Sequence, residues 1–510
     1  MVRKLDVEEL QHFAQGRGLS IAPNEQEEFK TLSDALIGIL DVLDVQDVAA
    51  APVLEAVRDA GGPPEPGEDP YNAIVRWCRV EAGTSGILSG KRIALKDSIS
   101  VASIPLTCGS RVLSGFVPVT DSIVAERVLK AGGEIVALTN MDDFALSAGG
   151  ESSFYGPTLN PFDLGRTAGG SSGGAAAALH YDRVDISVGC DQGGSIRVPA
   201  AWCGVIGLKP THGLVPYTGI VGIDQTFDHA GPMGQSIADV AALLQVIAGE
   251  DDSDPRQCDV PARDYLRAVM DLPDTLSGVT LGVVAEGFSE EAGVQQAVVE
   301  AAEGALDRFA ELGARIRRIS IPEHLQAGGA SFATAIQGMT NLLESGGNGY
   351  GWKGRYWTEL PTALGLGLRD YANDLSAQVK IYLILGAYLQ REYSGTLYAK
   401  AQNLRPMLAT AYDRALVGID ALLMPTTPGV AHTVGSSLPL AERVLRGWAV
   451  LSNTIPTDMT GHPALTIPAA QTGGLPVGVM LIGQRFGDDQ LLALAAAYER
   501  HHGWLPDRPR

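Results

Sequence analysis

Two glycine-rich segments constrain the fold of this chain more than any other feature. The first, RTAGGSSGGAAAA at 166–178, has too much glycine to begin as a helix, but its alanines favour one directly afterwards. The second, CDQGGSIRVPA at 190–200, follows VDISVGC, whose apolar and β-branched residues predict a buried strand. At the first loop, where a helix begins, unpaired backbone N–H groups face an anion or a developing negative charge.

A third segment, GKRIALKDSIS at 90–100, supplies a lysine, because IAL predicts a short buried strand that ends at Lys96. Burial disfavours the ammonium form, so Lys96 can exist as the neutral amine that a general base must be. Together with Ser171 and Ser195, it gives a hydrolase site that needs no histidine. The tight QGG turn predicts an oxyanion hole of successive backbone amides, from Gln192, Gly193, Gly194 and Ser195.

These segments resemble the amidase signature family of serine hydrolases. Further matches are TNMDDFALS at 139–147, GPTLNPFD at 156–163, GLKPTHGLVPYTG at 207–219 and TDMTGHPALTIPA at 457–469. The resemblance covers roughly residues 70 to 500. Within the family, the DQGGSIR variant and the long N-terminal extension look most like the bacterial amidases associated with nitrile hydratases.

The resemblance implies a role for each reacting group. Ser195 is the implied nucleophile, Ser171 the implied bridging serine next to a cis peptide bond, and Lys96 the implied base. Ser172 and Arg197 match positions that support the triad by hydrogen bonding. Asp191 is either a turn residue or a further member of this supporting set.

The substrate-binding residues are expected on three segments. The family places the MDDFALS segment against the substrate, which indicates Phe144 and Ala145, and Gly170 is expected beside them. Ile455 is an apolar candidate on the opposite side. The region 325–375 is either a wall of the acyl pocket or an ordered surface excursion, since its aromatic residues suit both: Tyr350, Trp352, Tyr356 and Trp357.

The expected reaction is hydrolysis of small, hydrophobic or aromatic carboxamides to a carboxylic acid and ammonia or an amine, through an acyl-enzyme and without a cofactor. The same triad would serve the main alternatives, a carbamate (urethane) hydrolase and an aryl acylamidase. Another alternative is the amidotransferase subunit that supplies ammonia to a partner charging transfer RNA.

Two unrelated chemistries are less consistent with the motifs. A phosphate-binding loop needs GxxxxGK[ST] or GxGxxG after a strand, and GGSSGG matches neither. A Ser-His-Asp triad could use His212, His229 or His462, but it would leave Lys96 and Ser171 without roles. No HExxH or other metal-spaced cluster occurs, so no metal site is expected.

Charge and composition restrict the binding partners and the cellular location that can be expected. The formal net charge of −21 disfavours a nucleic-acid partner, and a small-molecule amide or carbamate is expected instead. No run of 18 apolar residues predicts a membrane span, and the N-terminus lacks the apolar core of a signal peptide. Five widely spaced cysteines suit a reducing interior. A cytoplasmic protein is expected.

The order of elements predicts an α/β fold: the amidase signature fold, with a mixed, largely parallel sheet flanked by helices and an N-terminal helical extension. Residues 1–60 form that extension, which either caps the core or makes a homodimer. Residues 61–75, rich in glycine and proline, form a linker. Residues 76–505 form the catalytic domain, with 325–375 as an insertion at the substrate pocket.

Overall fold

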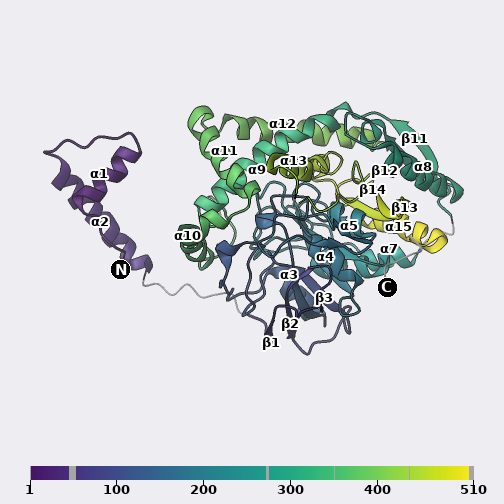
Figure 1. The fold of residues 1–510 in the computed structure, drawn as a ribbon, viewed down its shortest axis with the longest axis horizontal. Helices are drawn as coiled ribbons and strands as arrows, with labels where there is room; N and C mark the ends of the chain where they lie inside the picture. The colour runs from purple at the N-terminus through teal and green to yellow at the C-terminus, as the bar shows by residue number, and fades with distance from the viewer. Residues whose placement is uncertain are drawn as a thin grey trace. The chain divides into compact units, whose positions relative to one another are not determined.

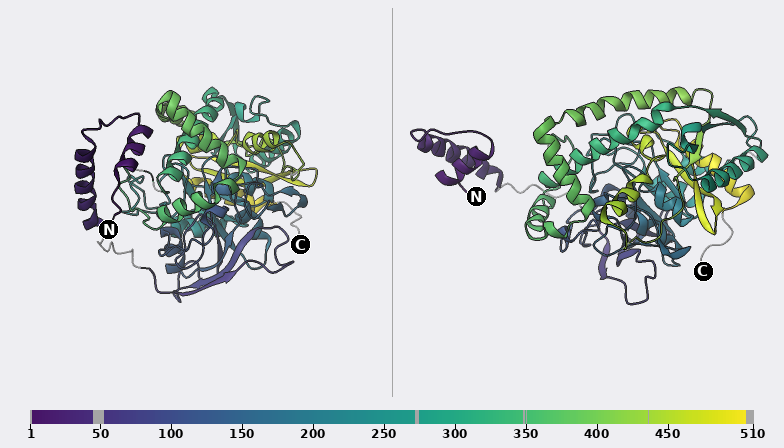
Figure 2. Two further views of the ribbon diagram at one scale, coloured as in Figure 1. Left: turned by 60° about the vertical axis from the view of Figure 1, so that its left-hand side comes forward. Right: turned by 45° about the horizontal axis from the view of Figure 1, so that its top comes forward.

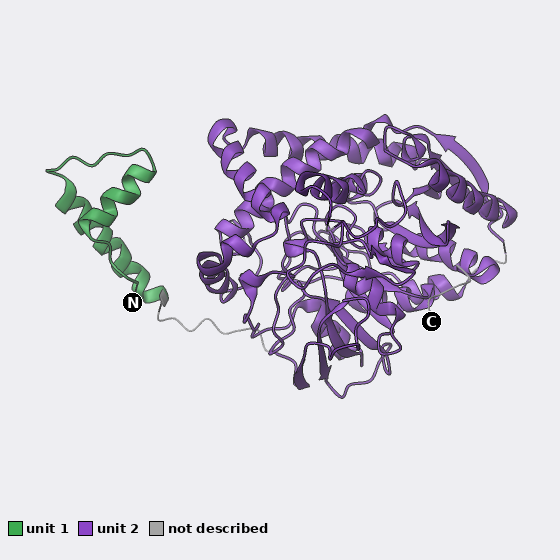
Figure 3. Cartoon of the chain, in the orientation of Figure 1, with its two compact units in different colours: residues 1–52 green, residues 53–510 purple. Residues whose placement is uncertain are grey.

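The structure, a computed structural model, describes residues 2–44, 53–271, 275–347, 349, 351–435 and 437–504. The chain forms two compact units, residues 1–52 and 53–510 (Figure 3). Tyr350 and the expected end of the catalytic domain at residue 505 lie outside the described residues, as do residues 45–52 of the expected extension.

The first unit consists of α1 (Val7–Gly16) and α2 (Gln26–Asp44). Asp6 caps α1 because its carboxylate accepts the backbone N–H of Glu9, whose own carboxylate accepts the N–H of Asp6. The helical pattern of this segment is therefore present in the structure. Residues 61–75, the segment expected to be a linker, include the end of one strand and the start of another.

The second unit is built on a sheet of twelve strands, in the order β1-β2-β4-β3-β7-β9-β8-β13-β14-β12-β10-β11. Their bounds are β1 (Val57–Gly62), β2 (Ile74–Glu81), β3 (Arg92–Lys96), β4 (Glu134–Thr139), β7 (Ile186–Asp191), β8 (Ile206–Lys209), β9 (His229–Gly234), β10 (Thr280–Val284), β11 (Arg315–Ile319), β12 (Ala421–Pro425), β13 (Ala464–Thr472) and β14 (Leu475–Ile482). A separate hairpin pairs β5 (Leu159–Asn160) with β6 (Asp163–Thr167).

The sheet is mixed, as expected, but it is not largely parallel. Only β3–β4, β3–β7, β10–β11 and β10–β12 are parallel among the neighbouring pairs, and the other seven are antiparallel. Parallel pairs need a crossover, whereas a tight turn joins antiparallel strands. The turn at Gly473 and Gly474 joins β13 to β14 in this way, and the sequence analysis did not identify these two strands.

Helices cover both faces of the sheet. They are α3 (Ile123–Lys130), α4 (Gly173–Ala177), α5 (Arg197–Cys203), α6 (Ile237–Ile247), α7 (Tyr265–Met270), α8 (Gln296–Glu311), α9 (Ala327–Glu344), α10 (Leu360–Tyr371), α11 (Ala377–Tyr393), α12 (Thr396–Ala415), α13 (Leu440–Ala449), α14 (Ile455–Thr460) and α15 (Asp488–His502). On one face α3, α6, α8 and α15 share the largest apolar core, and α4 and α5 pack on the other. A further core joins α5 to α9, α10, α11 and α12, and Figures 1 and 2 show α9, α11 and α12 grouped along one side of the unit.

The alternation of side chains along β3 decides where Lys96 lies. Ile93 and Leu95 point into the core shared with α3 and α6, while Ala94 packs with α4 and α5. Lys96 therefore belongs to the α4–α5 face, because side chains two positions apart lie on the same side of a strand. Among the described residues no helix is both long and apolar enough to span a bilayer.

Candidate active site

Lys96, at the end of β3, makes the first contact of the site. Its side chain is fully buried, and its Nζ donates a hydrogen bond of 2.6 Å to the Oγ of Ser171. Burial lowers the pKa of Lys96 below its ordinary value, although nearby acidic groups, including Asp142, oppose the shift. The geometry thus places an amine of weakened basicity directly on a serine hydroxyl.

The loop that carries Ser171 is held by an aspartate. The peptide bond between Gly170 and Ser171 is cis, and Asp142 donates its backbone N–H to the carbonyl of Ser171 at 3.3 Å. The Asp142 carboxylate also accepts backbone N–H groups of Gly150 and Ser152, at 3.0 and 2.9 Å. A Cβ on Gly170 would lie 1.8 Å from an oxygen of this carboxylate, so only glycine fits there.

Ser195 lies in the loop between β7 and α5, and Ser172 connects this loop to the segment of Ser171. The backbone N–H of Ser172 donates to the carbonyl of Ser195 at 3.1 Å. The Ser172 hydroxyl donates to the carbonyl of Cys190 at 3.0 Å and accepts the N–H of the same residue at 3.2 Å. The predicted segments of Lys96, Ser171 and Ser195 are thus brought together.

A buried ion network lies beneath the loop of residues 192–195. The Asp191 carboxylate accepts the backbone N–H of Ile196 at 2.9 Å and pairs with Arg197 through both oxygens, at 2.9 and 3.0 Å. Burial would raise the pKa of Asp191, but the Arg197 guanidinium outweighs this effect and lowers it. Asp191 and Arg197 therefore stabilise the turn on both sides of Ser195.

Helix α14 completes this network. Arg197 also donates to the carbonyl of Thr454 at 2.9 Å and to the Asp458 carboxylate at 2.7 Å. Thr454 in turn donates its hydroxyl to the carbonyl of Gly193 at 2.5 Å. Burial and the neighbouring Asp191 raise the pKa of Asp458 well above its ordinary value.

The sequence analysis missed the structural roles of Asp142, Thr454 and Asp458. Asp142 lies inside the MDDFALS motif and Asp458 inside TDMTGHPALTIPA, so the motifs contained the signal. Their contacts join residues far apart in the chain, which no local pattern predicts.

A small cavity of about 40 Å³ opens beside Ser195. Its described lining has no charged side chain and consists of Ala145, Leu146, Ser147, Gln192, Gly193, Ser195, Ile223, Phe227, Ser331, Phe332, Ala335, Tyr382, Trp448, Leu451 and Ile455. Of the residues expected at the substrate, Ala145 and Ile455 line it. Phe144 and Gly170 are buried but are not part of this lining.

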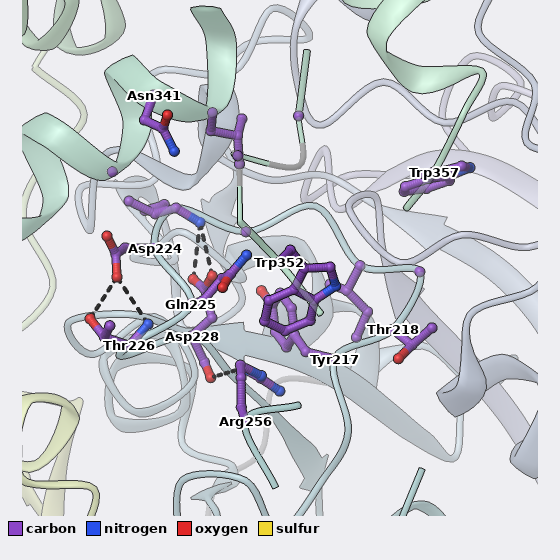
Figure 4. A pocket seen from close by; sticks show the side chains of 18 of the residues that line it. Tyr217, Thr218, Asp224, Gln225, Thr226, Asp228, Arg256, Asn341, Trp352 and Trp357 are labelled. Atoms are coloured by element: carbon purple, nitrogen blue, oxygen red, sulfur yellow. Dashed lines mark hydrogen bonds between the residues drawn. The ribbon is translucent and has the colours of Figure 1, made fainter. Parts of the chain in front are cut away.

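Figure 4 shows a second and larger cavity, of about 250 Å³. Ile223 lines both cavities, and Trp352 and Trp357 from the 325–375 region line the larger one. The Gln192 side chain donates to the hydroxyl of Tyr217 at 2.8 Å, which connects the loop of Ser195 to the wall of this cavity.

The three histidines considered for an alternative triad have other partners. His229 contacts the carbonyl of Phe227 at 2.7 Å and Nζ of Lys209 at 3.3 Å, and burial lowers its pKa well below the ordinary value. His212 contacts the carbonyl of Gln225, and His462 contacts Thr460 and Asp413. In the described parts of the chain, no three His, Cys, Asp or Glu side chains are grouped to hold a metal ion.

Comparison with known proteins defines the class of this site as that of an enzyme acting on amide C–N bonds. The family model named Amidase matches residues 76–492. The chain therefore belongs to the amidase family. Nothing in the comparisons bears on an association with nitrile hydratases.

Several curated relatives are A subunits of one enzyme, glutamyl-tRNA(Gln) amidotransferase. The protein of Methanosarcina acetivorans is 36% identical, over 84% of this chain and 87% of its own. That of Microcystis aeruginosa is 38% identical, over 83% and 86%. Among solved structures, the same subunit from Thermotoga maritima has a TM-score of 0.70 at 29% identity, covering 99% of this chain and 98% of its own. The peptide amidase of Stenotrophomonas maltophilia has a TM-score of 0.68 at 27% identity, covering 84% and 85%.

These relatives correct two sequence-based predictions. The expectation of a free amidase or carbamate hydrolase for small hydrophobic substrates is wrong, because the relatives are subunits of an amidotransferase. The expectation of a homodimer without a nucleic-acid partner is wrong for the same reason. The prediction relied on the net charge of the chain. Net charge is a poor guide here, because a subunit can serve a tRNA-dependent reaction without itself binding the phosphates of the tRNA.

Proposed function

We propose that this chain hydrolyses the C–N bond of a primary carboxamide as one subunit of an amidotransferase that acts on glutamyl-tRNA(Gln). The observation that supports this most directly is the 36–38% identity to such subunits over 83–84% of the chain. Glutamine and asparagine, the amino acids with primary carboxamides, are the donors we propose to test.

The proposed chemistry uses Lys96, Ser171 and Ser195 as a proton relay. The neutral amine of Lys96 takes a proton from Ser171, which takes one from Ser195 as the Ser195 oxygen attacks the amide carbonyl. The proton then returns along the relay to the nitrogen, the C–N bond breaks, and ammonia leaves an acyl-enzyme. Water enters by the same relay, and its attack releases the carboxylic acid and restores Ser195. The distance of 2.6 Å between Nζ of Lys96 and Oγ of Ser171 is short enough for a proton to pass between these two groups.

The developing oxyanion needs donors, which we propose to be the backbone N–H groups of Gln192, Gly193, Gly194 and Ser195. In the described part of the chain these N–H groups have no intramolecular acceptor. Removing one donor from such a site typically costs roughly 2.7–4 kcal/mol of transition-state stabilisation. Ser172, Asp191 and Arg197 would act by holding this loop, through the hydrogen bonds described above.

The proposed acyl site is the small cavity, with Ala145 and Ile455 in contact with the donor. Phe144 and Gly170 would then shape the site from behind this lining. We also propose that residues 325–375 belong to the substrate pocket, since Phe332 lines the small cavity and Trp352 the larger one. A cytoplasmic location, where charged tRNA is used, remains a prediction.

The test compares the chain with its Ser195→Ala variant. Tagged versions of both would be recovered, with any bound partners, from the cells that naturally make them. Ammonia release from glutamine and asparagine, and conversion of glutamyl-tRNA(Gln) to glutaminyl-tRNA(Gln), would be measured on each preparation. The proposal requires both activities in the wild-type preparation and neither in Ser195→Ala. Amide hydrolysis without any tRNA conversion would rule out the amidotransferase role.

A further inference from the structure

Helix α2 of the first unit carries a continuous row of exposed apolar side chains. Along the helix, the residues of this row are three and four positions apart in alternation: Phe29, Leu32, Leu36, Ile39 and Leu43. Each of them is between 43% and 66% exposed. A single exposed apolar residue is ordinary, but a row of them on one helix marks an interaction site.

Within the described part of the first unit, α1 packs on another side of α2 (Figure 1). That side contains the half-buried positions of α2, which are Gln26, Lys30, Ser33, Asp34, Ile37 and Asp41. The Asp41 carboxylate accepts the backbone N–H of Val2 there, at 2.7 Å. Because a helix has 3.6 residues per turn, these positions and the apolar row point in different directions. The unit thus buries the more polar side of α2 and leaves the more apolar side in solvent.

The spacing of the row indicates what shape of partner fits it. Apolar residues that repeat every 3.5 positions on average form the seam of a coiled coil or helical bundle, in which each side chain fits between side chains of a facing helix. The row keeps this repeat over two heptads, from Phe29 to Leu43, and the exposed Leu40 widens it. The partner that matches this repeat is an amphipathic helix.

The charge of α2 distinguishes between the helices that could cover the row. The sequence of α2 contains five acidic residues and a single basic one, Lys30, whose ammonium group is paired with Asp34 at 2.5 Å. Near the start of the chain, Arg3 is paired with Glu9 at 2.6 Å. A second copy of the chain would bring the same negative charge against α2, which opposes association. A helix with lysine and arginine beside its apolar side has the complementary charge.

We propose that the apolar row of α2 binds an amphipathic helix of another protein, whose apolar side is bordered by lysine and arginine. The five apolar side chains would pack between those of the partner, and Glu25 and Glu28, at the N-terminal end of the row, would attract its cations. The row belongs to the first unit and the reacting groups to the second, so the inference goes beyond the proposed function.

The first experiment uses the full-length chain and two synthetic helical peptides of about three heptads. Both have isoleucine and leucine on the apolar side, and the positions that border this side are lysine in one peptide and glutamate in the other. Fluorescence anisotropy of the labelled peptides measures binding at low and at high salt. We expect the lysine peptide to bind roughly tenfold more tightly or better, and high salt to reduce the difference by screening. Equal binding of the two peptides, or binding of neither, would overturn the inference.

A double variant and a control locate the surface that binds the peptide. Leu36→Ala with Ile39→Ala shortens the middle of the row and should weaken binding of the lysine peptide roughly tenfold or more. Both side chains are exposed, so the circular dichroism spectrum should stay that of the wild type. Val417→Ala, which is 74% exposed in the second unit, is the control and should leave binding unchanged. A double variant that binds like the wild type would show that the peptide occupies another surface, and the inference would be wrong.

Two further measurements identify the natural occupant of the row. If sedimentation shows a dimer for the wild type and a monomer for the double variant, a second copy covers the row and the inference is overturned. A photo-crosslinking residue in place of Leu36, in the cells that naturally make the chain, should react with a segment of another protein. We expect the sequence of that segment to have an apolar heptad repeat bordered by lysine and arginine. A crosslinked segment that is acidic, or that belongs to this chain itself, would contradict the proposal.

Discussion

Replacement of Lys96 by methionine separates the chemistry of this lysine from its packing. Methionine fills a similar volume without an amine, so Lys96→Met removes the 2.6 Å hydrogen bond and leaves the buried Ser171 hydroxyl without that partner. An unpaired buried polar group costs about 1–3 kcal/mol. A buried amine is itself costly, as the lowered pKa of Lys96 indicates, so its removal offsets part of this cost. Because proteins are stable by roughly 5–15 kcal/mol, the variant should fold.

The loss of activity should be much larger than the loss of stability. A general base contributes about 10²- to 10⁴-fold to the rate, which equals roughly 2.7–5.5 kcal/mol of activation free energy. Ammonia release from glutamine measures this loss, and thermal unfolding followed by circular dichroism verifies the fold. Lys400→Met, at an exposed position of α12, is the control and should keep wild-type turnover. A folded Lys96→Met protein with turnover within tenfold of wild type would refute the assignment of the base.

Three further perturbations test the surroundings of the proposed triad. Gly170→Ala should prevent folding or abolish turnover, because the new Cβ would lie 1.8 Å from a carboxylate oxygen. The control is Gly365→Ala, which has open space around it and should leave the melting temperature and turnover unchanged. Thr454→Val removes the 2.5 Å hydrogen bond to Gly193 and should lower stability by about 1 kcal/mol and turnover by roughly tenfold, as seen by urea unfolding and ammonia release. Burial lowers the pKa of Lys209 from 10.5 to about 8, so between these pH values the unfolded chain binds a proton that the folded chain does not. Its contribution to stability must therefore rise with pH across that window, and urea titrations of Lys209→Met should lack this rise.

Local patterns were enough to predict the strands that precede Lys96 and the loop of Ser195. The strand ending at Lys96 and the strand before the QGG turn are both present, as β3 and β7. Their short apolar runs, ended by polar or glycine residues, are typical of strands buried on both faces. The expected helix after GGSSGG begins at Gly173, but α4 ends at Ala177 after only five residues. Its alanines have high helix propensity, yet tertiary packing sets the length.

The other features of the fold and of the site depend on contacts between residues that lie far apart in the sequence. The hydrogen bond from Arg197 to Asp458 joins residues 261 positions apart, and that from Thr454 to Gly193 also spans 261. The direction of each strand pair is likewise a property of the connection and not of the strand, which explains why the parallel share of the sheet was overestimated. Function was misjudged for a related reason, since chains similar to this one include both a peptide amidase and subunits of an amidotransferase.

The buried charges under the loop of Ser195 are arranged so that they would not oppose the oxyanion proposed there. Two cations, Arg197 and Lys209, lie among two carboxyl groups, Asp191 and Asp458. Burial, with Asp191, raises the pKa of Asp458. Arg197 lowers the pKa of Asp191 despite burial. The pKa of Lys209, about 8, favours its charged form at neutral pH, and the two cations then balance both carboxylates even when both acids are ionised. A net negative charge at this place would destabilise the negative charge that develops on the substrate carbonyl, since such interactions are strong in a dry interior. The second carboxyl group can therefore hold Arg197 in position without weakening the proposed donors above it.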